Sequence, residues 1–239
     1  MSESNQLVTN NAGAVKAAST RSLRAERTRE RLLRTAIRLF ARHGFDGLSV
    51  DALVARARVN KRMVYHYFGS KAGLYAACLE AAYGELALLE SELVSEGDEP
   101  FQAVERIVRG YFAFLQQNRD FSALLLWENL QGGRALPQIR TRIFKAGMLA
   151  ALQRIIDDGV RRGQFRPNLN ARHLLIDLIG LAQVYVSNRL TLTASVGVDL
   201  SDRLVLAAAV DHAVELVLQG VAAGDLSAGQ RTGRNNGSE

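Results

Sequence analysis

Three cations, Lys61, Arg62 and Lys71, stand where the sequence predicts helix N-termini. A helix N-terminus carries partial positive charge and normally favours Asp or Glu, typically by about 0.3–1 kcal/mol. Lys or Arg in a first turn is therefore mildly unfavourable unless an external anion compensates. A phosphate group is such an anion, because helix N-termini together with Lys or Arg form a common phosphate-binding arrangement. The alternative is that three surface cations occur there by chance.

An aromatic run, Tyr65, His66, Tyr67 and Phe68, lies between these cations. On a helix of two turns, Val64 and Phe68 are four residues apart and form the expected core pair, so the other three side chains cannot all point inward with them. Tyr hydroxyls and an imidazole can hydrogen bond to phosphates or base edges, and an aromatic ring can contact a thymine methyl group. The run therefore favours a DNA groove as the partner. For His66, an ordinary surface histidine is an equal alternative.

Capping residues predict two short helices followed directly by a long one. Ser49 is a good N-cap for the first helix, and Asn60 is a good N-cap for the second. Gly69 offers a left-handed C-cap, and Ser70 can cap the third helix. The pattern predicts a helix-turn-helix motif over about residues 50–69.

The segment from about Ser22 to His43 predicts an amphipathic helix with apolar residues at three and four spacing on one face. A dense series of arginines lies on the other face: Arg21, Arg24, Arg27, Arg29, Arg31, Arg34, Arg38 and Arg42. A solvated charged face explains most of them. The N-terminal ones, Arg24 included, are the better DNA candidates, and a basic arm that reaches a neighbouring groove is the sharper hypothesis.

Residues 24–75 resemble the DNA-binding domain of the tetracycline-repressor (TetR) family. The segments AIRLFARHGFDGLSVDAL and VNKRMVYHYFGSK carry the resemblance. It implies an N-terminal three-helix DNA-binding domain, a divergent all-α ligand and dimer domain, and usually repression that a ligand relieves. By motif position, Ser49 and Lys71 resemble phosphate contacts. The residues that resemble the groove-facing set are Asn60, Lys61, Arg62, Met63, Tyr65, His66 and Tyr67.

Two positions depart from the family pattern. Arg58 stands at a turn where the family usually has Gly, and a non-Gly residue forced to positive φ costs on the order of 1 kcal/mol. Arg58 therefore either adopts a different turn or directs its charge at a phosphate, and we include it among the predicted DNA contacts. The second helix also opens on the long side chains of Lys61, Arg62 and Met63, where the family commonly has small residues. That opening leaves the base preference unpredicted.

Positive charge is concentrated in one part of the chain. Residues 16–71 hold 14 Lys or Arg against 4 Asp or Glu, a net charge of +10, while the whole chain is +6 and the remainder therefore −4. This asymmetry is typical of a nucleic-acid-binding domain attached to something else. With 239 residues, 48% hydrophobic residues and only 3 prolines, the chain is expected to be a helical globular protein with a proper core.

The expected fold is all-α, with an N-terminal three-helix helix-turn-helix DNA-binding domain at 19–72 joined to a C-terminal helical ligand and dimerisation domain at 73–223. Residues 1–18 and 224–239 are expected to be flexible tails. The first twenty residues lack the apolar core of a signal peptide, and no uninterrupted apolar run appears long enough to span a bilayer. The single cysteine, Cys78, is expected to be buried, and a cytoplasmic location without a membrane partner is expected.

The last two predicted helices, from about Ala171 to Leu192 and from Leu200 to Ala222, are apolar on more than one face. Such a helix must be covered on several sides, and a partner subunit is a good candidate for the second cover. We therefore expect a C2 homodimer with a four-helix bundle across the axis, whose recognition helices, about 34 Å apart, meet a palindromic double-stranded operator. The predicted interface residues are Leu178, Ala182, Val186, Leu204, Ala208, His212 and Leu216.

A cavity for an unknown small-molecule effector is expected in the C-terminal domain, by the same resemblance. Its predicted lining is Tyr111, Phe114, Phe121, Leu125, Trp127, Glu128, Asn129, Phe144, Met148, Gln183 and Tyr185. Ordinary core packing is the alternative for most of these residues. Glu128, Asn129 and Gln183 are more informative, because buried polar groups require partners and a ligand can provide them. The expected mechanism is a population shift, in which the ligand favours a form with wrongly spaced recognition helices.

Two other classes of protein compete with a regulator. An all-α enzyme is disfavoured, because the chain lacks a phosphate-binding Gly loop, a HExxH pair and clustered Cys or His; no catalytic residue, metal ligand or cofactor is predicted. A nucleoid-type protein would bind DNA with strong salt dependence and no sequence preference. Within the regulator class, activation and ligand-independent binding stay open beside repression.

Overall fold

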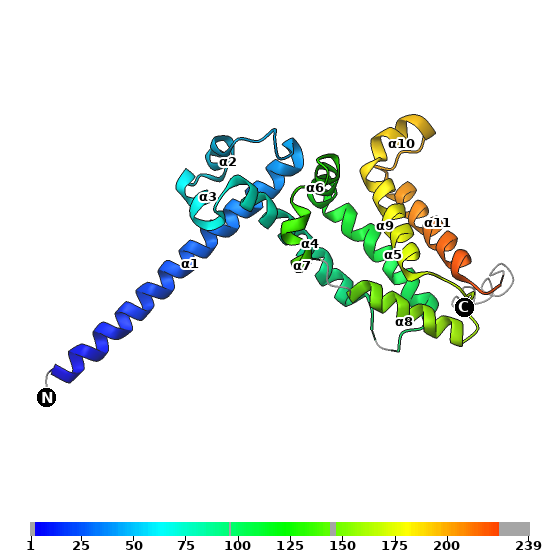
Figure 1. Ribbon diagram of the computed structural model, residues 1–239, viewed down its shortest axis with the longest axis horizontal. Helices are drawn as coiled ribbons and strands as arrows, with labels where there is room; N and C mark the ends of the chain where they lie inside the picture. Colours follow the sequence, from blue (N-terminus) through cyan, green and yellow to red (C-terminus); the bar gives the residue numbers. More distant parts are fainter. Residues whose placement is uncertain (1–2, 96, 144–146, 225–239) are drawn as a thin grey trace, which may run out of the picture. The chain divides into compact units, whose positions relative to one another are not determined.

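The computed structural model describes the backbone of residues 3–95, 97–143 and 147–224, and the side chains of 23–95, 97–139 and 147–224. Within these ranges the fold is all-α, as predicted, and one antiparallel bridge joins Phe165 to Ala222 (Figure 1). The helices are α1 Glu3–His43, α2 Val50–Ala57, α3 Lys61–Phe68, α4 Lys71–Leu93, α5 Pro100–Gln117, α6 Arg119–Leu130, α7 Leu136–Ile143, α8 Gly147–Arg161, α9 Ala171–Ser187, α10 Arg189–Val196 and α11 Arg203–Val221.

The chain divides into two compact units. Unit 1 comprises Met1–Ala81 and Leu126–Ile139, and unit 2 comprises Ala82–Leu125 and the chain from Arg140 onward. The boundaries therefore fall within α4, α6 and α7, whereas the sequence predicts the first domain boundary between residues 72 and 73. Unit 1 also includes a segment, 126–139, that the sequence analysis assigned to the C-terminal domain.

The core of unit 1 is formed where the C-terminal part of α1 packs on α2 and α3 (Figure 1). Leu32 and Phe40 of α1, Leu53 of α2, Val64 of α3 and Leu74 of α4 are almost completely buried. The helix ends are stabilised locally, because side-chain oxygens accept bonds from backbone N–H groups that have no partner within the helix. The capping residues are Ser49 for α2, Asn60 for α3 and Ser70 for α4. They hold α2, α3 and α4 as three separate helices joined by tight turns, as the sequence predicts.

Helix α1 begins at Glu3, well before the predicted start near Ser22. No proline interrupts this segment, and an α-helix ends only where its hydrogen-bonding pattern is broken or a stop residue occurs. The flexibility expected for residues 1–18 stays a prediction. The other expected tail, 224–239, lies outside the described residues apart from Gly224.

The segment 126–139 packs into unit 1 through three side chains. The indole Nε1–H of Trp127 donates to the carbonyl oxygen of Ala41 at 3.2 Å, and Arg134 forms an ion pair with Asp46 at 3.1 Å. The buried carboxylate of Glu128 accepts bonds from the backbone N–H of Ala135 at 2.7 Å and from the next residue at 3.3 Å. Glu128 therefore satisfies backbone donors at the start of α7.

In unit 2, α5 packs against α8, α9 and α11. Pro100 occupies the first turn of α5, where its missing N–H is not needed, and Glu99 caps the helix by accepting from Gln102 N–H at 3.0 Å. The expected helix 171–192 is divided, because α9 ends at Ser187 and α10 begins at Arg189. Helix α11 starts at Arg203 behind an Asp202 cap, close to the predicted position.

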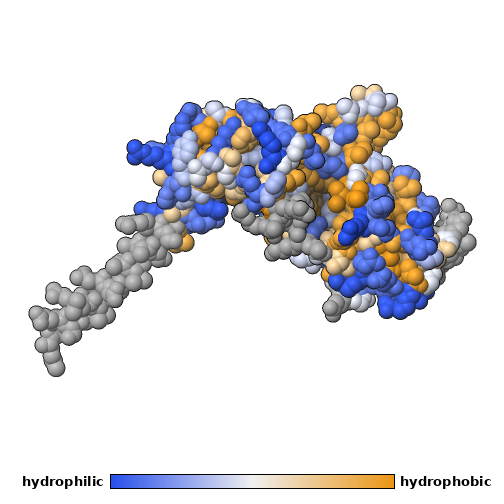
Figure 2. Space-filling view, in the orientation of Figure 1, coloured by the Kyte–Doolittle hydropathy of each residue, from blue (hydrophilic) through white to orange (hydrophobic). Residues whose placement is uncertain are grey.

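Apolar side chains remain exposed on α9, α10 and α11. Ile176 and Ile179 of α9, Leu190 of α10, and Leu204 and Leu216 of α11 are all exposed. Figure 2 shows hydrophobic surface gathered over this part of unit 2. The described fold thus leaves one side of α9 and α11 without a cover.

Two helices, α4 and α11, are long and apolar enough to cross a bilayer by length and composition. Acidic residues interrupt both helices, so they do not contradict the prediction that no uninterrupted apolar run is long enough to span a bilayer. Both helices contribute to cores, which explains much of their apolar character. Leu74, Cys78 and Leu79 of α4 are buried, as are Val214 and Val217 of α11. A core helix of a soluble protein passes the same length and composition criterion.

Candidate nucleic-acid interface

Helix α3 has one buried face and one exposed face. Val64 is fully buried and Phe68 is half-buried, so the predicted core pair points inward. The predicted groove-facing residues divide into two groups: Lys61, Arg62, Tyr65 and His66 are exposed, and Met63 and Tyr67 are half-buried. Tyr65 has 49% of its surface exposed, more than is usual for a large aromatic side chain. The exposed set combines cations with hydrogen-bonding rings at the start and middle of α3.

Capping residues orient α3 and its neighbours. Asn60 Oδ1 accepts from Arg62 N–H at 2.8 Å, and Ser49 Oγ accepts from Ala52 N–H at 3.1 Å. Ser70 Oγ accepts from Gly73 N–H at 3.0 Å at the start of α4. The oxygen of Asn60 is thus used by the cap, while its amide N–H groups stay available. The exposed Ser49 hydroxyl can still donate its proton to a phosphate oxygen.

Two of the three first-turn cations have partners within unit 1. Lys61 Nζ lies 2.8 Å from Asp51 Oδ1, and this hydrogen-bonded ion pair raises the pKa of Lys61. Lys71 Nζ lies over the ring of Phe45, 4.4 Å from its centroid. Arg62 is exposed at the first turn of α3. Lys61 with a carboxylate beside it attracts an external phosphate less than a lone lysine does, and the sequence pattern gives no sign that Asp51 lies next to Lys61.

Arg58 adopts the left-handed conformation, with φ 52° and ψ 50°, at the C-cap of α2. Its N–H donates to Ala55 O at 3.3 Å, and the N–H of Val59 donates to Val54 O at 3.2 Å. The chain therefore makes the turn that glycine usually makes, which excludes the first of the two alternatives for Arg58, a different turn. The exposed side chain of Arg58 leaves its charge in solvent, and its carbonyl oxygen accepts from Arg31 at 3.4 Å.

The remaining predicted DNA contact, Arg24, is exposed on α1. The ring of Phe68 is covered by the guanidinium of Arg29, 5.4 Å from its centroid, so Arg29 serves the packing of α3. Cys78 is fully buried, as predicted, and burial raises the pKa of its thiol. In the described residues no group of His, Cys, Asp and Glu is arranged to hold a metal ion.

The predicted effector-pocket residues do not all belong to one unit. Trp127, Glu128 and Asn129 lie in unit 1, where the first two contact Ala41 and the start of α7. Oε1 of the buried Glu128 accepts bonds from backbone N–H groups at the start of α7, so this atom needs no ligand. The side chain of Phe144 lies outside the described residues. The other predicted residues, which belong to unit 2, are Tyr111, Phe114, Phe121, Leu125, Met148, Gln183 and Tyr185.

Most of the aromatic residues in this second group form ordinary core contacts. The rings of Phe114 and Phe121 are 5.2 Å apart, and Tyr185 packs against Phe112 at 5.6 Å. Ordinary core packing therefore accounts well for these aromatic residues. The buried Tyr111 hydroxyl donates to Glu90 Oε1 at 2.6 Å.

The Tyr111–Glu90 pair is the clearest buried polar contact of unit 2. Burial raises the pKa of Glu90, and the bond from Tyr111 opposes that rise. Burial, followed by the bond to Glu90, raises the pKa of Tyr111. Both side chains are therefore shielded from water, and each is the hydrogen-bond partner of the other.

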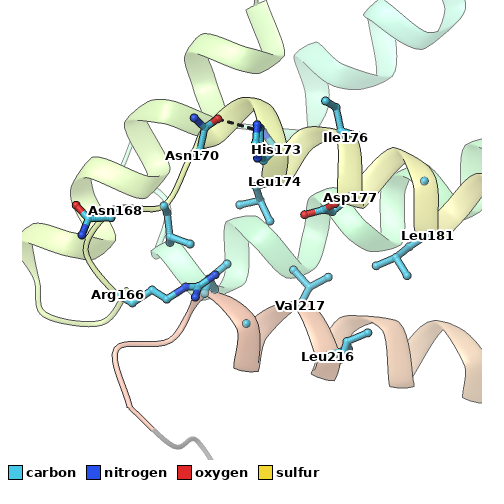
Figure 3. Close-up of a pocket in the computed structure, with 14 residues that line it drawn as sticks. Arg166, Asn168, Asn170, His173, Leu174, Ile176, Asp177, Leu181, Leu216 and Val217 are labelled. Atoms are coloured by element: carbon cyan, nitrogen blue, oxygen red, sulfur yellow. Dashed lines mark hydrogen bonds between the residues drawn. The ribbon is translucent and has the colours of Figure 1, made fainter.

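Unit 2 has an open groove of about 770 Å³ between α9 and α11 (Figure 3). Its polar lining includes Arg166, His173 and Asp177, and Leu174 and Val217 form part of its apolar floor. None of the residues predicted for the effector pocket lines this groove. It opens on the same side of α9 that carries the exposed Ile176.

The predicted dimer residues lie on different faces. Leu204, Ala208, His212 and Leu216 of α11 are exposed, and Val186 of α9 is half-buried. Leu178 and Ala182 are buried within the protomer, because this face of α9 packs on its own unit, so their assignment to a surface was wrong. The exposed face of α9 instead carries Ile176, Ile179 and Val184. A helix apolar all round shows no preferred side, which is why the sequence did not distinguish them.

Comparison with known proteins gives matches along most of the chain. Residues 32–78 match the model of bacterial regulatory proteins of the tetR family, and residues 100–217 match the tetracyclin repressor-like C-terminal domain. The HTH-type transcriptional repressor NicS of Pseudomonas putida is 31% identical over 202 residues, which are 84% of this chain and 95% of that protein. The HTH-type transcriptional regulator RutR of Escherichia coli K12 is 26% identical, over 87% of this chain and 97% of that protein.

Solved structures show the same fold. The transcriptional regulator FadR from Bacillus subtilis, in complex with stearoyl-CoA, aligns with a TM-score of 0.61 at 18% identity, over 80% of this chain and 98% of that chain. The capped helix-turn-helix, its exposed basic and aromatic face, both family models and the long alignment with NicS agree. The chain therefore belongs to the TetR family of DNA-binding transcriptional regulators.

Proposed function

We propose that this regulator is a repressor that binds a palindromic operator as a homodimer and leaves it when a small-molecule effector binds unit 2. The observation that carries the DNA-binding part is the outward face of α3, where Arg62, Tyr65 and His66 are exposed while Val64 anchors the helix in the core. Repression is favoured because NicS, a relative that aligns over 84% of the chain, is named a repressor. DNA phosphates would supply the anion that the first turns of α3 and α4 favour.

The homodimer is supported by the uncovered apolar faces of α9 and α11. Leu204 is 81% exposed, Ile176 65% and Leu216 51%, and a monomer gains nothing from presenting such side chains together. A two-fold axis beside these helices would bury each face against its copy, and the groove between α9 and α11 would receive side chains from the partner. A symmetric dimer also presents two recognition helices to a palindrome.

Effector binding is proposed to act by a population shift in unit 2. An effector that prefers a form with wrongly spaced recognition helices lowers the affinity for the operator. The coupling is reciprocal, so bound DNA lowers the affinity for the effector by the same free energy. The polar residues Tyr111 and Gln183 remain proposed contacts in that unit. We further propose a cytoplasmic, non-enzymatic protein that needs no cofactor.

Selection of bound fragments from random duplex DNA tests the proposal. We expect a palindromic consensus, and addition of a small-molecule library to the selected complex should reveal compounds that release the protein and raise its melting temperature. Binding without sequence preference would indicate an architectural DNA-binding protein instead. A consensus in promoters whose transcription rises with the protein would indicate an activator, and the absence of any releasing compound would contradict the effector.

A further inference from the structure

Six arginines of α1 form one continuous stripe, which we call the arginine ridge: Arg24, Arg27, Arg31, Arg34, Arg38 and Arg42. They follow one another at intervals of three or four residues. With 3.6 residues per helical turn, these intervals keep all six side chains within about a quarter of the helix circumference. The ridge is about 27 Å long at a rise of 1.5 Å per residue.

Every arginine of the ridge is exposed, and in the part of the chain whose side chains are described none forms an ion pair with a carboxylate. Some arginines elsewhere in the described residues do have carboxylate partners. Arg106 pairs with Asp98, and Arg109 pairs with both Glu105 and Asp211. On α1 itself, Glu26 pairs with Arg29, which lies off the ridge. Six unneutralised guanidinium groups repel one another, which is costly unless a polyanion compensates.

The ridge adjoins the helix-turn-helix motif. The guanidinium of Arg31 reaches the carbonyl oxygen of Arg58, in the turn that immediately precedes α3. From this point α1 continues past α2 and α3 towards its N-terminus (Figure 1). The middle of the ridge therefore lies beside the turn that leads into α3, the helix proposed to contact the base pairs.

The chemistry of the ridge favours DNA over other anionic partners. A membrane-binding helix needs an apolar face free to enter the lipid, whereas Leu32, Ala36 and Phe40 of α1 are buried in the core of unit 1. A stable protein interface needs an apolar or aromatic centre, which this stripe lacks. Guanidinium groups match the geometry of phosphate oxygens, and a row of them suits a regular series of phosphates.

We propose that the arginine ridge binds the phosphate backbone of duplex DNA that flanks the operator, without regard to its sequence. This inference rests on the proposed operator binding by α3 and extends it. A ridge about 27 Å long corresponds to about eight base pairs, since each base pair adds 3.4 Å along the duplex axis. The protein would thus protect more DNA than the two recognition helices contact.

The test compares the selected operator as a minimal duplex with the same operator extended by about 12 base pairs on each side. The ridge variant carries Arg27→Gln, Arg34→Gln and Arg38→Gln, which preserves helix propensity. A matched control, with Arg119→Gln, Arg154→Gln and Arg161→Gln, removes the same three charges from exposed positions of unit 2. Binding is measured by fluorescence anisotropy over a range of salt concentrations, with circular dichroism to verify the fold.

We expect the wild type and the control to bind the long duplex more tightly than the minimal one. The ridge variant should lose this difference. Its plot of log K against log salt for the long duplex should be shallower by about two to three units, since each phosphate contact contributes about 0.9. Equal slopes for the ridge variant and the wild type would overturn the proposal, as would an equal loss on both duplexes.

A scrambled long duplex separates this proposal from the proposed function. If the wild type does not distinguish the operator from the scrambled duplex, operator recognition fails, while a shallower slope of the ridge variant on scrambled DNA still supports the ridge. If the wild type prefers the operator to the scrambled duplex but binds the minimal and extended operators equally, only the proposal about the arginine ridge fails. Anionic vesicles that bind the wild type and not the ridge variant, without a flank effect on DNA, would also overturn it.

Discussion

The indole ring of Trp127 lies directly against Gly44, so a Cβ atom at residue 44 would come within 2.8 Å of Trp127 Cε3. Gly44 is also left-handed, with φ +67°, at the end of α1. The same indole donates to the carbonyl oxygen of Ala41. Residues 86 positions apart are thereby joined, and the contact explains why the segment 126–139 belongs to the DNA-binding unit.

Gly44→Ala should destabilise the protein strongly for two separate reasons. Left-handed strain costs about 1–2 kcal/mol for a residue with a Cβ, and overpacking against Trp127 adds typically 1–3 kcal/mol. Gly69→Ala is the matched control, because Gly69 has φ +73° but no atom near its Cβ position. Urea denaturation should show the larger loss for Gly44→Ala. The added loss should shrink in a Trp127→Leu background; an unchanged difference would mean that the ring is not responsible.

Arg58→Gly should affect stability and DNA binding in opposite directions. Glycine relieves about 1–2 kcal/mol of left-handed strain but adds about 0.5–1 kcal/mol of unfolded-state entropy, so the free energy of unfolding should rise slightly. The slope of log K against log salt should fall by about 0.9, because the proposed phosphate contact of Arg58 is lost. Denaturation and anisotropy measure the two effects. If DNA affinity does not change, Arg58 serves only the turn.

Asp51→Asn should tighten DNA binding. The substitution removes a carboxylate beside the first turn of α3 and frees Lys61, whose Nζ lies 2.8 Å from Asp51 Oδ1. Affinity for the operator should rise several-fold, and the salt slope should steepen by about one phosphate contact. Asp51→Glu keeps the charge and is the control. Weaker binding by Asp51→Asn would show that Asp51 positions Lys61 for DNA.

Glu90 should make stability depend on pH. Because burial raises its pKa in the folded protein above the ordinary value of 4.5, the folded state holds the proton more tightly than the unfolded state. Its contribution to the free energy of unfolding is therefore fully present below pH 4.5 and is lost as the pH rises through the raised pKa. Glu90→Gln should remove this decline in denaturation curves taken at several pH values. The exposed Glu92→Gln should leave the decline intact; a decline that persists in Glu90→Gln would assign it to another group.

Ile176→Glu combined with Leu216→Glu should convert the proposed homodimer into a folded monomer. A carboxylate on each exposed apolar face would be buried without a partner in the dimer, a cost of several kcal/mol. Analytical ultracentrifugation should show the mass of one chain, and operator affinity should fall steeply. Leu88→Glu, at an exposed leucine of α4, is the control. A wild type that sediments as a monomer at micromolar concentration would refute the dimer itself.

Sequence alone determined the features that depend on local rules. The caps at Ser49, Asn60 and Ser70 and the left-handed Gly69 predicted the start and end of α3 and its neighbours, because N-cap bonds and φ > 0 involve residues at most a few positions apart. The charge asymmetry and the exposed aromatic tip of α3 also followed from composition and helical periodicity. These features were sufficient for the family and for its DNA-binding role.

Tertiary structure decided what depends on distant partners. Periodicity does not reveal which side of an apolar helix faces its own core, so Leu178 and Ala182 were assigned to a surface although they are buried. The sequence predicts Trp127 and Glu128 as ligand contacts, but only the tertiary structure shows that they hydrogen bond to Ala41 and to the start of α7. The Lys61–Asp51 pair bridges two helices across a turn, and no local rule predicts it. A side chain's chemistry is local, but its availability to a ligand depends on neighbours that only folding brings together.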